Sequence, residues 1–467
     1  MQETSDIKIK QKKVRRIRFV SGRIIPLSFL LAILLGTLLL MLPVSTAPGE
    51  RTDFVTALFT ATTSICVTGL VVVDTYVHWS LFGKVVILCL IQLGGLGIVT
   101  VVSMLMLIAN KKFSLSDRAL LYDAFNMNTR SGILSFLVAV LKGTFAVEGI
   151  GAFLYAFSFV PRFGLVRGIW ISIFTSISAF CNAGIDIIGP DSLIGYQQDP
   201  WTLTVTMLLI VLGGLGYVVW FDMITTVKQG KANHYPVSKI IGRMGEHTKL
   251  VFRLTVLFIV SGAVFIFFAE YHNAGTIGNM SVGGKILNSF FQSVTFRTAG
   301  FAAVPQQNLT DISCIIGYIL MFIGGSPVGT AGGVKTVTVF IVILNALSFI
   351  RNRNETVVCK RKISEDLIRK AAAIVAVSLI TVFVLTLLLL ATNDVSMQDG
   401  FYEAVSALAT VGLSRGLTPA LNTKGRLLIV IGMYLGRIGP ISMAVFFSKI
   451  NPDKNGVSFS DGKFYVG

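Results

Sequence analysis

The sequence predicts an all-α membrane protein that consists of four similar units arranged around one pseudo-fourfold axis. Of the 467 residues, 53% are hydrophobic and only 13% are charged, whereas a typical soluble domain carries roughly 25% charged residues. Apolar runs that are long enough to cross a bilayer recur along the whole chain. One short segment pattern also occurs four times, which predicts an internal repeat.

The basic residues are distributed unevenly, and their distribution predicts the orientation of the chain in the membrane. The net charge is +17. Lys and Arg are concentrated in 1–23, 110–130, 228–253, 351–370 and 449–467, and they are sparse in 46–83, 161–200, 270–314 and 393–426. This alternation is the positive-inside pattern, so both termini and three linkers are expected in the cytosol. Anionic lipid explains the basic N-terminal segment better than nucleic acid does, and we expect no nucleic-acid partner.

The repeated segment is an amphipathic run rich in Ser, Thr and Phe that ends in small or polar residues and one glycine. The four copies are 54–69, 170–184, 287–300 and 401–412. Their final glycines are Gly69, Gly184, Gly300 and Gly412, which are 112 to 116 residues apart. A regular spacing over the whole chain indicates a repeated structural unit.

Each repeated segment lies between two long apolar runs. The runs before them are about 24–44, 134–160, 250–269 and 371–392, and the runs after them are about 83–109, 202–227, 315–350 and 425–449. The segments between the runs are too short to span, because ten helical residues cover about 15 Å of a hydrocarbon core of about 30 Å. The sequence therefore predicts eight transmembrane helices and four re-entrant pore helices. The expected boundaries are a cytosolic basic segment 1–23, repeats 24–110, 111–228, 229–350 and 351–450, and a cytosolic tail 451–467.

The loops after the half-helices have the chemistry of a cation pathway. Irregular backbone at membrane depth is tolerated only inside protein or along a water-filled cavity. A half-helix that points its C-terminal end at such a cavity presents partial negative charge, and the carbonyl oxygens that follow can replace the hydration shell of a cation. The loops lack rings of carboxylates, so they suit a monovalent ion such as potassium. The predicted filter residues are Cys66, Val67, Thr68, Gly69, Cys181, Asn182, Ala183, Gly184, Arg297, Thr298, Ala299, Gly300, Thr410, Val411 and Gly412.

The second apolar run of the third repeat is interrupted by glycine and proline, both of which disfavour helix. The corresponding segments of the first two repeats keep a Gly-Gly pair, and we expect them to continue as helix. The interrupted segment predicts a flexible loop across the pore below the filter. Together with Arg437, a charge at membrane depth in the fourth repeat, the predicted gate comprises Gly324, Gly325, Ser326, Pro327, Val328, Gly329, Thr330, Ala331, Gly332 and Gly333.

Four further charged residues lie near these segments. Lys335 closes the interrupted segment and is expected to extend toward the cytosol. Arg297 is expected to cap the C-terminal end of its own half-helix from behind the filter. Asp74 and Asp186 follow the first two filter loops, where they either concentrate cations or are ordinary solvated loop residues.

With these four loops, the chain resembles the Ktr/Trk/HKT superfamily of potassium transporters, and in particular its bacterial KtrB-type membrane subunits. The resemblance covers about 24–467, and the short segment before the first helix differs from Trk-type members, which carry an additional helix pair there. The resemblance implies potassium transport across a bacterial cell membrane, a homodimer, and a cytosolic nucleotide-binding regulatory ring of the RCK type. It also implies an arginine barrier beside an intramembrane gating loop, and it leaves open sodium as an activator. Each loop has one glycine where tetrameric potassium channels have two, so the loops do not predict tight discrimination against sodium.

Other functions remain as alternatives. A secondary transporter with alternating access is the main one, although such folds usually show broken helices in both halves. A membrane scaffold without transport is a further possibility. Gly412-Leu-Ser-Arg-Gly416 matches a nucleophile elbow, but no histidine lies within an apolar run to act as base, and no strand precedes it. We therefore expect no enzyme activity, and the five cysteines, with no Cys-x-x-Cys pair, predict neither a metal nor a covalent cofactor.

Overall fold

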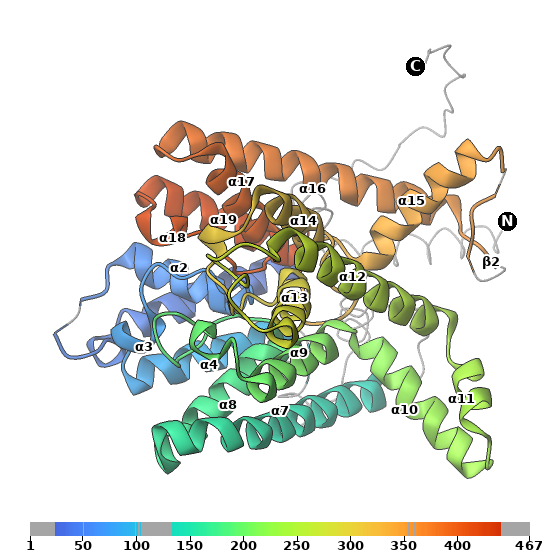
Figure 1. Ribbon diagram of the computed structural model, residues 1–467, viewed down its shortest axis with the longest axis horizontal. Coiled ribbons are helices and arrows are strands. Elements are labelled where there is room, and N and C mark those ends of the chain that lie inside the picture. The colour runs from blue at the N-terminus through green and yellow to red at the C-terminus, as the bar shows by residue number, and fades with distance from the viewer. Residues whose placement is uncertain are drawn as a thin grey trace, which may run out of the picture.

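The fold is helical, and it is described from a computed structural model. The structure describes residues 24–49, 51–98, 100, 103, 133–353, 355–358 and 361–439. The basic N-terminal segment, most of the linker between the first two repeats and the C-terminal tail therefore lie outside the described residues. Figure 1 shows the helices surrounding a centre where short helices and loops meet.

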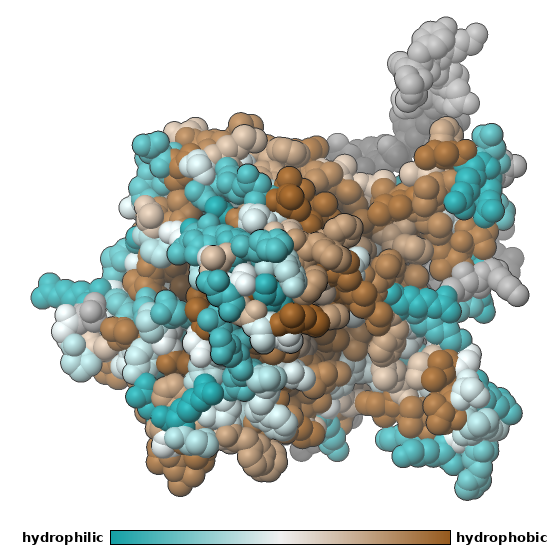
Figure 2. Space-filling model, viewed as in Figure 1, coloured by the Kyte–Doolittle hydropathy of each residue, from teal (hydrophilic) through white to brown (hydrophobic). Residues whose placement is uncertain are grey.

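The first helix of each repeat is long and apolar. These helices are Ile24–Leu40, α7 (Ile133–Phe163), α12 (Glu246–Glu270) and α16 (Glu365–Thr392). Within the described residues, α12, α16 and Ser135–Phe163 of α7 are each long and apolar enough to cross a membrane alone. Side chains such as Phe268, Ile380 and Leu387 are largely exposed on them. Figure 2 shows hydrophobic side chains gathered at the top and right of centre of this face, beside hydrophilic ones on the left and in the centre. Exposed apolar surface of this extent is expected where lipid is the solvent.

The four half-helices are α2 (Phe54–Ile65), α8 (Leu165–Cys181), α13 (Val282–Phe296) and α17 (Met397–Leu408). They contain 12 to 17 residues, which gives about 18 to 25 Å. The side chains of Asp53, Ser281 and Ser396 cap three of them at the N-terminus, so each begins at a defined residue. None of the four reaches the thickness of a hydrocarbon core of about 30 Å.

The second helices differ from the sequence prediction. They are α4 (Leu81–Leu96), α9 (Pro200–Gly214) with α10 (Tyr217–Ala232), α14 (Asp311–Phe322) with α15 (Thr336–Ile350), and α19 (Thr423–Ile438). The expectation that the third repeat alone is broken is wrong, because α9 and α10 meet at an angle of 93°. Gly97, Gly216 and Gly439 each have a φ of 83° to 92° at the break or helix end. Glycine readily adopts a positive φ, and a helix cannot continue through such a residue. The sequence prediction missed these helix ends because it expected the glycines to remain helical.

The remaining elements are short. They are η1 (Pro43–Ser45), α3 (Thr75–His78), η2 (Ile194–Tyr196), α11 (Val237–Arg243), η3 (Gln306–Asn308) and α18 (Leu417–Ala420). One antiparallel pair, β1 (Val357–Val358) with β2 (Arg361–Lys362), adds a minimal sheet to the expected all-α fold. It lies at the end of the molecule opposite α18 in Figure 1.

The packing of the helices closes into a ring. The second helix of each repeat contacts the half-helix of the next repeat: α4 packs against α8, α9 against α13, and α14 against α17. The last second helix, α19, packs against the first half-helix, α2. This order brings the ends of all four half-helices toward one centre.

Candidate functional site: a ring of four loops

Each half-helix is followed by a loop in which two residues adopt the left-handed conformation. The first is not glycine, and its φ is 50° to 69°; the second is the repeated glycine, with φ of 65° to 103°. The residues are Val67 and Gly69, Asn182 and Gly184, Thr298 and Gly300, and Thr410 and Gly412. Successive carbonyls alternate in an extended strand, whereas alternating left- and right-handed residues turn them toward one side. Left-handed β-branched residues such as Val67 are rare and typical of functional sites.

The loops are fixed to their own half-helices by matching hydrogen bonds. The amides of Thr68, Ala183 and Val411 donate to the carbonyls of Thr63, Ser178 and Ser406, each at 2.8 Å. The third loop departs from this pattern, because the Ala299 amide donates to the Thr295 carbonyl at 3.0 Å. Side chains add further contacts, since the Gly69 and Gly412 amides donate to the hydroxyls of Thr63 and Ser406. The strained loops are therefore held rigidly.

The four loops form a closed cycle around one axis. A methyl group placed on Gly69 would lie 2.5 Å from the Ala183 carbonyl oxygen. Methyl groups placed on the other three glycines would also meet carbonyl oxygens: the one on Gly184 would lie 2.7 Å from Ala299 O, the one on Gly300 2.6 Å from Val411 O, and the one on Gly412 2.1 Å from Thr68 O. Each glycine thus lies against the loop of the next repeat, and the fourth lies against the first. A side chain at any of these positions would collide with backbone, so the ring requires glycine.

The second helices support this ring through a further set of glycines. Methyl groups on Gly94, Gly213 and Gly436 would lie about 2 Å from the carbonyl oxygens of the half-helix ends at Ile65, Phe180 and Leu408. The residue after each of them is Gly95, Gly214 and Arg437, respectively. Arg437 therefore occupies the position at which the first two repeats have a second glycine.

The segment Gly324–Gly333 connects α14 to α15 and lies against the ring, at Thr298 and Ala409. Its two ends are joined by hydrogen bonds from the Gly324 amide to Val334 O and from the Val334 amide to Phe322 O, both at 3.0 Å. The Arg437 guanidinium donates to Thr330 O at 2.7 Å and also to Gly94 O. The structure thus brings together the interrupted segment and the arginine that the sequence analysis grouped with it.

Two basic residues lie differently from the sequence expectation. The Lys335 side chain does not extend away from the interrupted segment: its Nζ donates to Ala331 O at 2.6 Å, and so turns back onto the loop. Arg297 is the C-terminal cap residue of α13, but its guanidinium lies 3.5 Å from Gly324 O rather than against its own helix. Both side chains are long, and backbone carbonyls of the non-helical loop are free to accept from them.

A cavity of about 530 Å³ lies against the interrupted segment. It is lined by loop residues, by side chains of α16 such as Ile374 and Ser378, and by Lys335, Lys370 and Arg437. Leu408 and Ala409, at the end of the fourth half-helix, line the cavity as well, so it extends to the start of the fourth loop.

The two acidic residues after the first loops lie near each other, since the charge of Asp74 acts on Asp186. The Asp74 carboxylate caps α3 by accepting from the Tyr76 amide at 2.7 Å. The Asp186 carboxylate accepts from the Ile188 amide at 3.3 Å. Burial raises the pKa of Asp186 to about 6, although hydrogen bonds with Ser192 and Ile188 act in the other direction.

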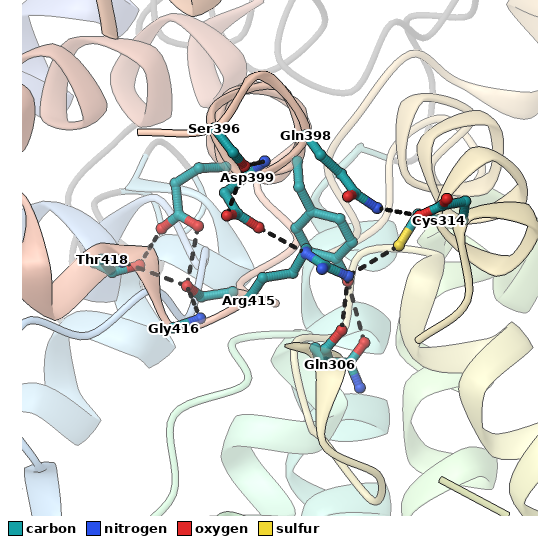
Figure 3. Close-up of polar contacts among 12 residues, drawn as sticks. Gln306, Cys314, Ser396, Gln398, Asp399, Arg415, Gly416 and Thr418 are labelled. Carbon is teal, nitrogen blue, oxygen red and sulfur yellow. Dashed lines mark hydrogen bonds and ion pairs between the residues drawn. The ribbon is translucent and has the colours of Figure 1, made fainter. Parts of the chain in front are cut away.

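Behind the fourth loop lies a polar network that the sequence analysis did not single out (Figure 3). Glu403 of α17 is fully buried and accepts from the hydroxyls of Ser414 and Thr418. Arg415 forms an ion pair with Asp399 at 2.8 Å and donates to Gln306 O at 3.2 Å. The network holds the chain segment that follows the fourth loop against its own half-helix and against the third repeat. Two acidic residues, Asp399 and Glu403, inside a half-helix without basic residues were the signal available in the sequence.

The same network accounts for the serine of the elbow-like motif. Ser414 donates to a carboxylate at 3.0 Å, and none of its contacts in the described structure is a histidine. No group of three potential metal-ligating side chains occurs among the described residues.

Comparisons with known proteins agree on one family. Residues 22–458 match the family model TrkH, described as a cation transport protein. The chain is 34% identical to the Ktr system potassium uptake protein B of Bacillus subtilis, covering 98% of this chain and 99% of the relative. It is 35% identical to the potassium/sodium uptake protein NtpJ of Enterococcus hirae, covering 94% and 95%.

The fold also matches a solved structure. The crystal structure of the potassium transporter TrkH from Vibrio parahaemolyticus aligns with a TM-score of 0.70 and 16% sequence identity, covering 90% of this chain and 84% of the other. At this identity the likeness concerns the fold alone. Together with the family match over nearly the whole sequence, it identifies the chain as a member of the TrkH family of cation transport proteins, which are membrane transporters and not enzymes.

Proposed function

We propose that the chain is the potassium-conducting subunit of an uptake system in a bacterial cell membrane, with the ring of four loops as its selectivity filter. The observation that carries this proposal is the closed cycle of loops with two left-handed residues each. Such loops can direct uncharged carbonyl oxygens at a common axis, and carbonyl cages suit a weakly hydrated monovalent cation. The named activities of the B. subtilis and E. hirae relatives support potassium as the ion.

The proposed architecture has eight membrane crossings and four re-entrant pore helices, with both termini in the cytosol. Gly324–Gly333 is the gate, because it contacts the third filter loop at Thr298 and also lines the cavity of about 530 Å³. Arg437 and Lys335 hold it by hydrogen bonds to its carbonyls. Sodium as an activator, a homodimer and a regulatory ring belong to the same proposal and rest on the resemblance to KtrB-type subunits.

The proposal is tested by Gly184→Ala, with Gly164→Ala as the matched control. Both glycines have positive φ, 65° and 80°. The ψ of 168° at Gly164 lies in a region essentially restricted to glycine, so the control substitution itself carries a backbone strain of about 1–3 kcal/mol. A methyl group on Gly184 would lie 2.7 Å from Ala299 O, whereas nothing lies within 4 Å of one on Gly164. In liposomes, Gly184→Ala should abolish potassium uptake and Gly164→Ala should retain it. Uptake by folded Gly184→Ala at the wild-type rate would contradict the proposal.

An alternating-access transporter is the second candidate, and one observation favours it. Two repeats, not one, have a broken second helix, at 215–216 and at 324–333. Flux measurements separate the two mechanisms, because a pore passes ions down their gradient without obligatory coupling to a second ion. Uptake that requires a stoichiometric sodium gradient would favour the transporter.

A further inference from the structure

The proposed gating loop is hydrogen bonded along its length to the helices around it. The Ser326 amide donates to Gly214 O at 3.0 Å, and Val328 O accepts from the Tyr217 amide at 2.9 Å. These contacts attach the loop to the break between α9 and α10. The loop is therefore part of the wall of the site and not a plug resting below it.

Thr330 is the residue of this loop whose side chain contacts the second filter loop. It is fully buried. Its amide donates to Gly213 O at 3.3 Å, and its carbonyl accepts from Arg437. Its hydroxyl donates to Phe180 O at 3.1 Å and lies 3.2 Å from the side-chain amide of Asn182. All its polar atoms are therefore engaged.

Both partners of the hydroxyl determine the shape of the second filter loop. Phe180 lies in the last turn of α8. The carbonyls of a last turn receive no hydrogen bond from within the helix, so they need a donor from outside it. Asn182 is the left-handed residue that begins the loop, with φ of 59°. A hydroxyl that contacts both fixes the point at which the half-helix becomes the filter.

The same loop contacts two other filter loops directly. The Gly332 amide donates to the Thr298 hydroxyl at 3.1 Å. A methyl group on Gly332 would lie 2.6 Å from Ala409 O, so the backbones of the gating loop and of the fourth loop are in close contact. Arg437 extends the connection to the first repeat through Gly94 O. The loop thus touches three quarters of the ring directly, and Arg437 links it to the first.

From this geometry we propose that Thr330 is a positioning residue for the second filter loop, so that the gating loop sets ion selectivity as well as opening the pore. The proposal rests on the proposed function, because it requires the ring to be the filter. Thr330 keeps these contacts while ions pass, and without its hydroxyl the Phe180 carbonyl and the Asn182 side chain lose a partner. The second loop then relaxes, and its carbonyls no longer hold the spacing that distinguishes potassium from sodium.

The test compares three variants of the full chain in liposomes, each assayed for initial rates of potassium and sodium uptake. Thr330→Val removes the hydroxyl and keeps the branched shape, whereas Thr330→Ser keeps the hydroxyl. Thr336→Val is the matched control, because its hydroxyl is buried without a hydrogen-bond partner just beyond the loop. Thr330→Val should lower the potassium-to-sodium ratio about tenfold, equal to about 1.4 kcal/mol. Thr330→Ser and Thr336→Val should stay within about twofold of wild type, well under 1.4 kcal/mol.

A Thr330→Val protein that changes both rates by the same factor would overturn the proposal, since a purely structural role or a gate alone acts on both ions equally. If Thr330→Val does not fold, Thr330→Ala removes the same hydroxyl without the added branch, and the same ratio decides. Gly184→Ala separates this failure from failure of the proposed function. If Gly184→Ala loses uptake and Thr330→Val keeps the wild-type ratio, the proposed filter stands and the role of Thr330 in selectivity is rejected. If Gly184→Ala takes up potassium normally, both proposals are rejected.

Discussion

Replacing Arg437 should open the proposed gate, because this side chain ties the gating loop to a different repeat. Its two terminal nitrogens donate to Thr330 O and to Gly94 O. Arg437→Gln removes the charge and cannot reach both carbonyls. Arg437→Lys keeps the charge but lacks the planar fork that allows two separate contacts.

The size of the effect follows from these two contacts. A hydrogen bond from a charged donor contributes about 1.5–3 kcal/mol, so the loss of both lowers the stability of the closed loop by at least about 3 kcal/mol. Every 1.4 kcal/mol changes an equilibrium tenfold. The ratio of closed to open loop should therefore fall on the order of 100-fold in Arg437→Gln, and less in Arg437→Lys, where one contact remains.

The assay is basal potassium flux into liposomes that contain the chain without any regulatory partner. Arg426→Gln is the matched control in the same helix, since Arg426 also donates to two backbone carbonyls, those of Leu421 and Pro419, but far from the loop. We expect higher basal flux in both Arg437 variants and wild-type flux in the control. A large increase in Arg437→Gln with none in Arg437→Lys would show that charge and not tethering closes the pore. Unchanged flux in both variants would refute the reasoning.

Three further predictions follow from the described contacts. Because the pKa of Asp186 is raised to about 6, protonation removes a negative charge at the mouth below that pH, so uptake at low potassium should fall from pH 7 to pH 5, and Asp186→Asn should flatten this dependence. Arg415→Ala should lower the free energy of unfolding in detergent by about 2 kcal/mol, since its ion pair is mostly buried, whereas Arg369→Ala, in an exposed pair, should cost about 0.5 kcal/mol or less. A cavity of about 10 Å³ faces the unpaired Arg297 Nε and Thr255 Oγ1, and a high-resolution map should show one ordered water there; an empty cavity would contradict this.

The positions of the four loops could be predicted from sequence, because each depends on a local signal. Gly69 and its equivalents end amphipathic runs at regular spacing. An amphipathic run that is too short to cross the bilayer, between two runs that are long enough, indicates a re-entrant half-helix. The break at 324–333 was equally visible, since glycine and proline act on the backbone directly.

Other features could not be read in this way. Gly97 and Gly216 occur within apolar runs, where a glycine permits either helix packing or a left-handed turn, and only the tertiary structure selects the turn. The Thr330 contact with Phe180 joins residues 150 positions apart, which no local pattern reports. The reach of Arg297 to Gly324 likewise depends on where a neighbouring loop lies.

Arg437 stands where the first two repeats have Gly95 and Gly214, and this has a consequence for how such a pathway can be regulated. A pore assembled from four identical chains would carry either four arginines at this depth or none, and four positive charges around one axis would repel every cation. A single polypeptide that supplies all four quadrants can change one quadrant alone. Covalent linkage of the quadrants is thus what permits a single, weak and reversible obstacle in a passage for positive ions.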